Sequence, residues 1–121
     1  AEAVVQINAA QLEIVLQNLL GNAVEALVGR AQGRIDITLK TENNMAVIDV
    51  IDNGPGLPKG QHERVFEMNY STKPVGMGFG LWLSRHIAQT HGGKLVALDS
   101  THGAHMRLSL PLATSNGTTP T

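Results

Sequence analysis

The stretch Val47–Pro58, VIDVIDNGPGLP, begins as an apolar strand and ends as a glycine-rich turn. Four β-branched residues between Val47 and Ile51 favour the strand. Asp52 then supplies a carboxylate that can accept a hydrogen bond from an amino group. Gly54 and Gly56 lack a Cβ, so a flat ring could approach their backbone. A ligand-binding wall and a plain surface turn both remain open, because Asn-Gly and Pro-Gly are also ordinary turn sequences.

The composition predicts one domain and excludes several kinds of partner. The 121 residues fit a single core, and 42% of them are apolar. The net charge is -1, so no basic excess points to nucleic acid. There is no cysteine, which excludes disulfides and thiolate metal sites. No apolar run approaches the roughly 20 residues that span a bilayer, so we expect no membrane contact by this chain.

The N-terminal region predicts a short edge strand over Ala3–Asn8 and then a helix from Ala9 to about Val28, capped by Asn8. Asn18 and Asn22 are four residues apart, so they share one face of that helix. They lie at the border of its apolar stripe. They are either two half-exposed amides or two amide oxygens that face a ligand or a hard cation.

Two antiparallel strands are expected next. Arg34–Glu42 alternates between apolar and polar residues, Asn43–Asn44 suits a two-residue hairpin turn, and Met45–Asp52 forms the returning strand. Asp49 lies in the middle of that second strand, and we expect it to face solvent.

A long connection over Lys59–Gly76 is typical of a lid or binding loop, with Val65 and Phe66 as its one anchored turn. Glycines at alternate positions then open a helix that runs to about His91. They favour a phosphate-binding loop, because backbone N–H groups and the helix dipole attract anions; a flexible hinge has the same appearance. The glycines are Gly76, Gly78 and Gly80.

The helix to His91 carries Trp82 on its polar side, which indicates either a docking surface or a ring lying flat on its own domain. Strands over Lys94–Asp99 and Ala104–Leu110 complete the expected sheet, and Pro111 ends the last one.

Four segments in chain order resemble the N, G1, F and G2 boxes of sensor histidine kinases: NLLGNAVEA, DNGPGLP, VFEMNYSTKP and GMGFGLWLSRHIAQTHGG. The chain is more widely similar to the GHKL superfamily, the nucleotide-binding domain shared with gyrase, mismatch-repair and heat-shock ATPases. The resemblance covers about Leu12 to Leu112. It implies an α/β (α+β) two-layer sandwich, with a mixed, mostly antiparallel sheet and helices on one face. Residues 1–113 would form the ATP-binding domain and residues 114–121 a disordered polar tail.

The resemblance assigns ATP and Mg²⁺ to particular residues. Asn22 and its neighbour Asn18 match the metal-binding position, and Asp52 matches the carboxylate that reads the adenine amino group. Asn18 stands where heat-shock ATPases carry a water-activating glutamate; an amide is a poor base, which favours phosphoryl transfer over hydrolysis. The remaining implied nucleotide-binding residues are Gly54, Gly56, Lys73, Gly76, Gly78, Gly80 and Leu81.

Two departures from the family pattern stand out. Ala104 follows Gly103 where many relatives carry Thr or Ser near the adenine, so that hydroxyl is missing. The phosphoacceptor histidine with its flanking acid is also absent, so no catalytic residue is assigned to this chain. The five histidines are scattered without metal-ligand spacing, at His62, His86, His91, His102 and His105.

The resemblance therefore implies the catalytic domain of a bacterial two-component sensor histidine kinase, a transferase. It would transfer the γ-phosphate of Mg-ATP to a histidine on a separate dimerisation and phosphoacceptor domain, with a response regulator downstream. The full-length protein would be a homodimer, cytoplasmic or anchored in the inner membrane through other regions. The alternatives are a serine/threonine kinase of the anti-sigma type and a non-catalytic ATP-binding docking module.

Overall fold

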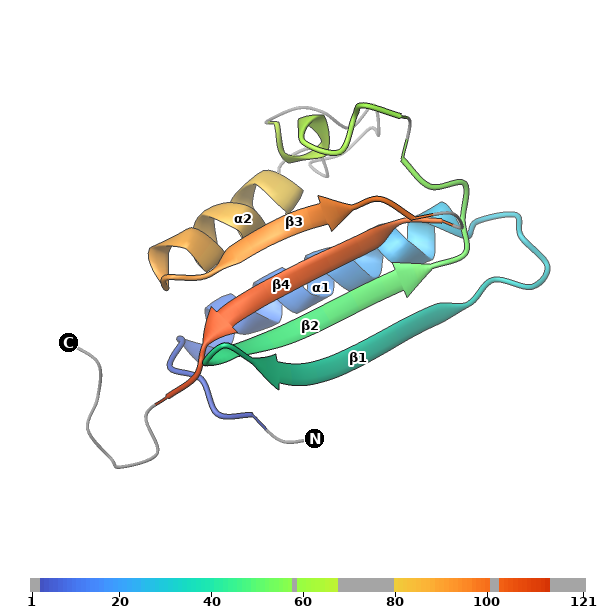
Figure 1. Cartoon of the computed structure of the whole chain (residues 1–121). Coiled ribbons are helices and arrows are strands. Elements are labelled where there is room, and N and C mark those ends of the chain that lie inside the picture. The colour runs from blue at the N-terminus through green and yellow to red at the C-terminus, as the bar shows by residue number, and fades with distance from the viewer. Residues whose placement is uncertain (1–2, 58, 68–79, 101–102, 114–121) are drawn as a thin grey trace.

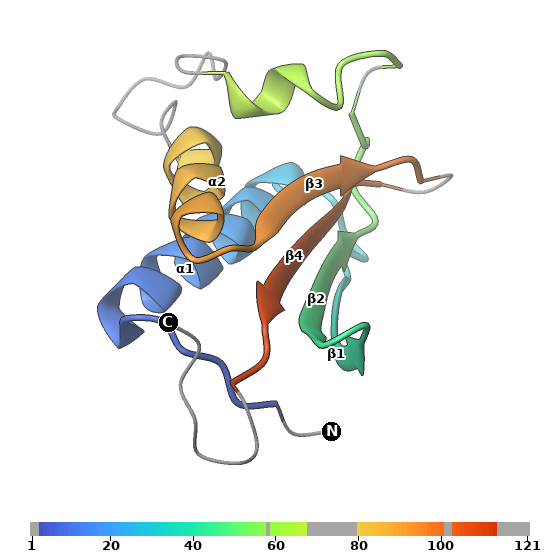
Figure 2. The same ribbon diagram turned by 60° about the vertical axis from the view of Figure 1, so that its left-hand side comes forward.

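A computed structural model describes residues 3–57, 59–67, 80–100 and 103–113. Within these residues two helices, α1 and α2, pack on one face of a four-stranded sheet (Figures 1 and 2). The strand order is β1-β2-β4-β3, and all three pairings are antiparallel. The predicted two-layer α+β fold is confirmed. In chain order the elements are α1 (Ala9–Ala26), β1 (Ile35–Glu42), β2 (Met45–Asp52), the 3-10 turn η1 (Arg64–Phe66), α2 (Gly80–Thr90), β3 (Lys94–Leu98) and β4 (His105–Pro111).

The start of α1 follows from one side chain. Asn8 Oδ1 accepts hydrogen bonds from the backbone N–H groups of Ala10 at 2.8 Å and Gln11 at 3.3 Å. These are amides that have no partner inside the helix, so Asn8 acts as the N-cap. The helix ends at Ala26, two residues before the expected Val28, and Gly29 follows in the left-handed conformation.

The β1–β2 hairpin forms as its turn chemistry predicts. Asn43 and Asn44 both have positive φ, at 53° and 61°, as a two-residue type I′ turn requires. Glu42 therefore pairs with Met45, and the register continues without interruption to Ile35 opposite Asp52.

The prediction of a strand over Ala3–Asn8 is wrong. Only one isolated bridge forms there, between Val5 and Leu112. A single further backbone bond, from Ala113 N to Val4 O, supports it. The chain passes the end of the sheet at one point and then enters α1, so no ladder develops.

The core lies between the helices and the sheet. Val15 and Leu19 of α1 are 1% exposed, and Leu95 of β3 and Leu108 of β4 are equally buried. The expected turn at Val65 and Phe66 is η1, and both side chains are buried. None of the described helices is long and apolar enough to cross a membrane.

Candidate functional site

Asp52 is held rigidly at the end of β2. Its Oδ1 accepts hydrogen bonds from the backbone N–H of Gly54 at 2.8 Å and of Ala104 at 3.2 Å. Within the described residues no group donates to Oδ2. The residue is 5% exposed. One carboxylate oxygen is thus fixed by the backbone, and the other remains able to accept a hydrogen bond from a ligand.

Glycines allow the turns around Asp52 to pack closely. A Cβ on Gly54 would lie 2.8 Å from the carbonyl oxygen of Ala26 at the end of α1. Gly56 and Gly103 both have positive φ, and a Cβ on Gly103 would collide with the Asp52 carbonyl. Gly54 and Gly56 therefore serve the packing of the chain on itself. The sequence did not reveal that position 103 requires a glycine, because the requirement arises from a contact between segments that are distant in the chain.

Asn18 connects the two helices. Its Nδ2 donates hydrogen bonds to the carbonyl of Gly80 at 3.2 Å and to Ser84 Oγ at 3.0 Å. Ser84 is fully buried. Gly80 is the first residue of α2, so the structure places Asn18 at that helix's N-terminus. The sequence did not reveal Ser84, because a serine inside a helix carries no signal of a partner in another helix.

Along α1, Asn22 lies between the residue that contacts the start of α2 and the residue that contacts the turn at Gly54. Asn18, Asn22 and Ala26 are spaced four residues apart and share one side of α1. Asn18 contacts the start of α2 and Ala26 contacts Gly54, so Asn22 lies between these two contacts. Asn22 is half-buried, and among the described residues its side chain makes no hydrogen bond. Its amide is therefore available to a ligand.

The residues present fit a nucleotide and a divalent cation. A buried carboxylate with a free oxygen suits an amino group, and amide oxygens are ligands that hard cations accept. Gly80 and Leu81 supply the helix N-terminus, which favours anions. Three expected ligands, Lys73, Gly76 and Gly78, lie outside the described residues. No three His, Asp or Glu side chains within the described part of the chain group together as metal ligands.

A pocket of about 360 Å³ lies beside the turn after β2. Gly56, Gly103 and Ala104 contribute to its wall, together with Leu98 and His62. None of Asn18, Asn22 or Asp52 lines it. We therefore do not identify this pocket with the site that the asparagines form.

Trp82 rests partly on its own helix. Its ring stacks on His86, with centroids 5.7 Å apart and planes 3° from parallel. The residue remains 39% exposed. This geometry favours the interpretation in which the ring covers its own domain. On the neighbouring side of α2, Arg85 lies 4.6 Å above the ring of Phe66 and so links α2 to η1.

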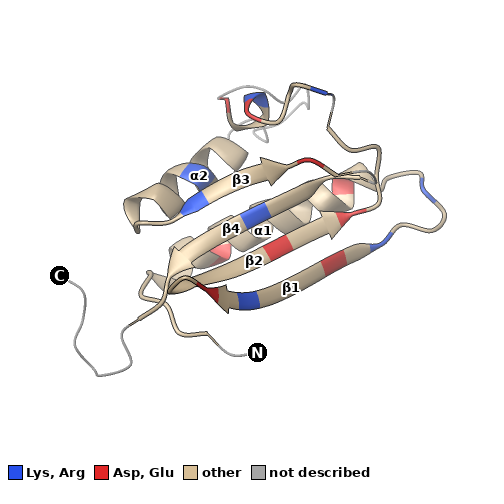
Figure 3. Ribbon diagram, in the orientation of Figure 1, with Lys and Arg blue, Asp and Glu red and all other residues tan. Residues whose placement is uncertain are grey.

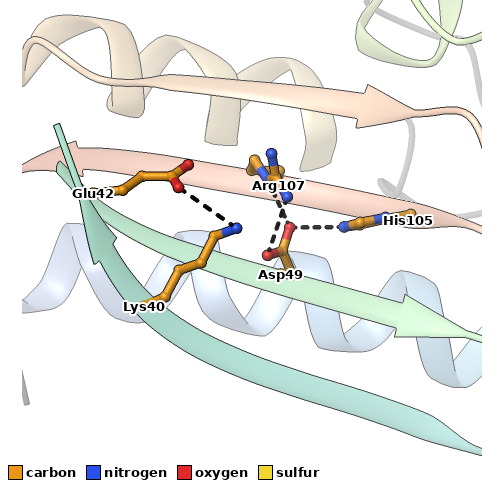
Figure 4. A network of polar contacts seen from close by, with 5 residues as sticks. All are labelled: Lys40, Glu42, Asp49, His105 and Arg107. Atoms are coloured by element: carbon orange, nitrogen blue, oxygen red, sulfur yellow. Dashed lines mark hydrogen bonds and ion pairs between the residues drawn. The ribbon is translucent and has the colours of Figure 1, made fainter. Parts of the chain in front are cut away.

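Asp49 forms a buried polar network on the sheet face away from the helices (Figure 4). Its Oδ1 accepts hydrogen bonds from Arg107 Nε at 2.8 Å and from His105 Nε2 at 2.7 Å. Asp49 lies on the face away from the helices, as predicted. The prediction that it faces solvent is wrong, because the residue is only 5% exposed. The reason is register, which pairs Asp49 directly with Arg107.

The network shifts the ionisation of both partners. Burial by itself raises the pKa of Asp49, but hydrogen bonds and charge from Arg107 and His105 outweigh it, so the pKa of this carboxyl lies below its ordinary value. The hydrogen bond from Arg107 to Asp49 in turn raises the pKa of the guanidinium. Both groups are therefore charged at neutral pH.

Comparison with known proteins identifies the family of this chain. Residues 7–114 match the family of histidine kinase-, DNA gyrase B- and HSP90-like ATPases. The sensor protein KdpD of Escherichia coli is 40% identical over 108 residues, which are 85% of this chain and 12% of KdpD. The sensor protein ChvG of Agrobacterium fabrum is 36% identical over 111 residues, 82% of this chain and 18% of ChvG.

A solved structure gives the same result. The catalytic domain of histidine kinase ThkA superposes with a TM-score of 0.78 at 30% identity, covering 88% of this chain and 70% of that domain. This chain corresponds to less than a fifth of KdpD or ChvG. It belongs to the histidine kinase-, DNA gyrase B- and HSP90-like ATPase family, as an ATP-binding catalytic domain of the histidine kinase type.

Proposed function

We propose that this chain binds Mg-ATP and presents the γ-phosphate to a histidine on a separate phosphoacceptor domain of the same protein. The observation that carries the proposal is the position of Asn22, between the Asp52–Gly54 turn and the start of α2. The whole protein would be a cytoplasmic-facing homodimeric kinase that passes the phosphoryl group to a response regulator.

Asp52 would read the adenine. Its Oδ2 is oriented by the two hydrogen bonds that hold Oδ1, so it can accept from the exocyclic amino group without reorganising. Guanine carries a carbonyl oxygen at the corresponding ring position, which would face the carboxylate and repel it. The arrangement therefore favours adenine nucleotides over guanine nucleotides.

Asn22 and Asn18 would serve the phosphate end. Their amide oxygens would hold Mg²⁺, which when bound neutralises charge on the phosphates. Gly80 and Leu81 would add the partial positive charge of the α2 N-terminus. Asn18 cannot act as a general base toward water, since an amide does not take up a proton near neutral pH. Positioning and charge neutralisation would then promote transfer to a protein acceptor.

Nucleotide binding is tested by calorimetric titration of this chain with ADP and a non-hydrolysable ATP analogue, with and without Mg²⁺, beside GTP. We expect magnesium-dependent binding of the adenine nucleotides that GTP does not match. Equal binding of GTP, or no binding of any nucleotide, would contradict the assignment of Asp52 and the asparagines.

Transfer is tested by adding the phosphoacceptor domain in trans with labelled ATP. We expect acid-labile phosphate on its histidine. Phosphate that appears on serine or threonine of a partner would indicate the anti-sigma type of kinase instead. An unlabelled acceptor in the presence of intact ADP binding would indicate a docking module.

A further inference from the structure

The outer edge of β1 exposes backbone groups that no described strand pairs. Among the strands that the structure describes, β1 is the first in the sheet order and pairs only with β2. Arg34 O accepts from Asn53 N at 3.2 Å, and the register places Asp36 opposite Ile51 and Thr38 opposite Asp49. The even-numbered residues of this segment therefore direct their backbone N–H and C=O groups toward β2. In an antiparallel ladder the alternate residues point away, so the odd-numbered residues from Ile35 to Thr41 direct theirs outward.

The same edge exposes apolar side chains. Ile37 and Leu39 pair with Val50 and Ile48 and so point to the helix side of the sheet. They are nevertheless 55% and 37% exposed, because neither helix extends over β1 (Figure 2). A regular, unbulged edge with exposed apolar residues is a surface that other strands readily pair with.

The opposite face of β1 carries alternating charges. The charges alternate in sign along β1 and the residue before it (Figure 3): positive Arg34, negative Asp36, positive Lys40 and negative Glu42. They form two exposed ion pairs along the strand, Arg34–Asp36 at 3.1 Å and Lys40–Glu42 at 3.8 Å. Exposed pairs of this kind contribute little stability, so they leave the charges free to meet others.

This pattern is complementary to itself. If a second β1 runs antiparallel with Thr38 opposite Thr38, then Asp36 faces Lys40 and Arg34 faces Glu42. Ile37 faces Leu39, and their outward N–H and C=O groups pair. The charged positions then form the non-hydrogen-bonded pairs, in which side chains lie closest.

Neighbouring registers are opposed by charge. A shift of two residues in one direction places Asp36 opposite Glu42. A shift in the other direction places Arg34 opposite Lys40. A shift of one residue is excluded, because it would match outward-directed backbone groups with inward-directed ones. The charges thus select the register centred on Thr38.

We propose that β1 is a homotypic interface, through which two copies of this chain join their sheets into one. A lysine on an edge strand often prevents such pairing, but here each Lys40 would meet an Asp36 of the second copy. The interface lies on the side of α1 away from α2, whereas Asn18 donates its hydrogen bonds to α2. It therefore leaves the nucleotide site open and does not depend on the proposed function.

The test is sedimentation equilibrium of this chain and of charge variants over a range of concentrations into the millimolar region. We expect the wild-type mass to rise toward that of a dimer. Asp36→Lys would place Lys opposite Lys40, and Lys40→Asp would place Asp opposite Asp36. Each variant alone should weaken the dimer about tenfold or more, since two like-charge pairs replace two attractive ones.

Mixing supplies the decisive control. An equimolar mixture of Asp36→Lys and Lys40→Asp restores both opposite-charge pairs, so two variants that are monomeric separately should form a heterodimer. Circular dichroism and cooperative urea unfolding would show that each variant is folded. A monomeric wild type at every concentration would overturn the proposal. A dimer that the single variants leave unchanged, or a mixture that stays monomeric, would overturn it as well.

Discussion

Asp52 and Ala104 exchange two hydrogen bonds. The Asp52 N–H donates to the Ala104 carbonyl at 3.0 Å, and the Ala104 N–H donates to Asp52 Oδ1 at 3.2 Å. The backbone of residue 104 thus orients the carboxylate, whatever side chain that residue carries. The missing hydroxyl at Ala104 removes a possible contact to the base but leaves the orientation of Asp52 intact.

Replacement of Asp52 by asparagine therefore tests adenine recognition with little change in the fold. The asparagine Oδ1 can still accept from Gly54 and Ala104, while an NH₂ group takes the place of Oδ2. Two donors would then face each other at the adenine amino group. We expect ADP affinity to fall roughly tenfold to hundredfold, the effect of about 1.5–3 kcal/mol for a hydrogen bond to a charged group.

The matched control for that titration is Asp49→Asn. It makes the same chemical change three residues earlier on β2, on the opposite face of the sheet. It should leave ADP affinity unchanged. Equal loss in both variants would show a general effect on the sheet, and unchanged affinity in Asp52→Asn would remove Asp52 from the site.

Asn22→Ala addresses the cation. Alanine favours a helix more than asparagine does, so α1 should persist. We expect Mg²⁺ no longer to strengthen ATP binding, measured by calorimetry at matched ionic strength. Gln17→Ala, an amide removed from the exposed side of the same helix, should retain the magnesium effect. If magnesium strengthens binding to Asn22→Ala as before, the metal ligand is another residue.

Local rules account for much of the fold. The Asn8 cap and the Asn43–Asn44 turn each depend on neighbours in sequence, and each is confirmed. The resemblance to the histidine kinase boxes also implied the helices on one face of the sheet.

The details missed from sequence depend on partners far along the chain. Asp49 is buried because register brings Arg107 and His105 beside it. Gly103 must lack a side chain because it packs against the Asp52 carbonyl. The predicted strand over Ala3–Asn8 does not form, because only Val5 pairs with the sheet region, opposite Leu112. Each of these depends on three-dimensional placement, which spacing in one sequence does not encode.

The Asn18–Ser84 hydrogen bond gives a prediction about coupling between the helices. Ser84→Ala leaves the Asn18 amide with the Gly80 carbonyl as its one remaining partner among the described residues, and we expect the free energy of unfolding to fall by about 1 kcal/mol. In an Asn18→Ala background the same change should cost less, because the shared bond is already absent. Urea unfolding of the two single variants and the double variant measures this difference. Strictly additive losses would show that the two side chains do not interact.

Asp49 should make stability depend on pH in the acid range. Its pKa is lower in the folded chain than its ordinary value, so the unfolded chain binds the proton more tightly. The stabilisation is fully present above the unfolded pKa of about 4 and is lost as pH falls through the folded pKa. Asp49→Asn lacks this group, so its unfolding free energy should fall less steeply in acid. At pH 7 we expect the variant to be about 1–3 kcal/mol less stable, since Arg107 and His105 lose their charged partner.

Urea unfolding at a series of pH values would measure this effect, with Glu67→Gln as the control because Glu67 is an exposed carboxylate. The difference between wild type and Asp49→Asn should be constant near neutral pH and shrink below about pH 4. The control should follow the wild-type curve closely, since its ion pair with Arg64 is at the surface. A difference that stays constant into acid would show that the carboxylate's charge contributes nothing, and that the network is held by its neutral hydrogen bonds.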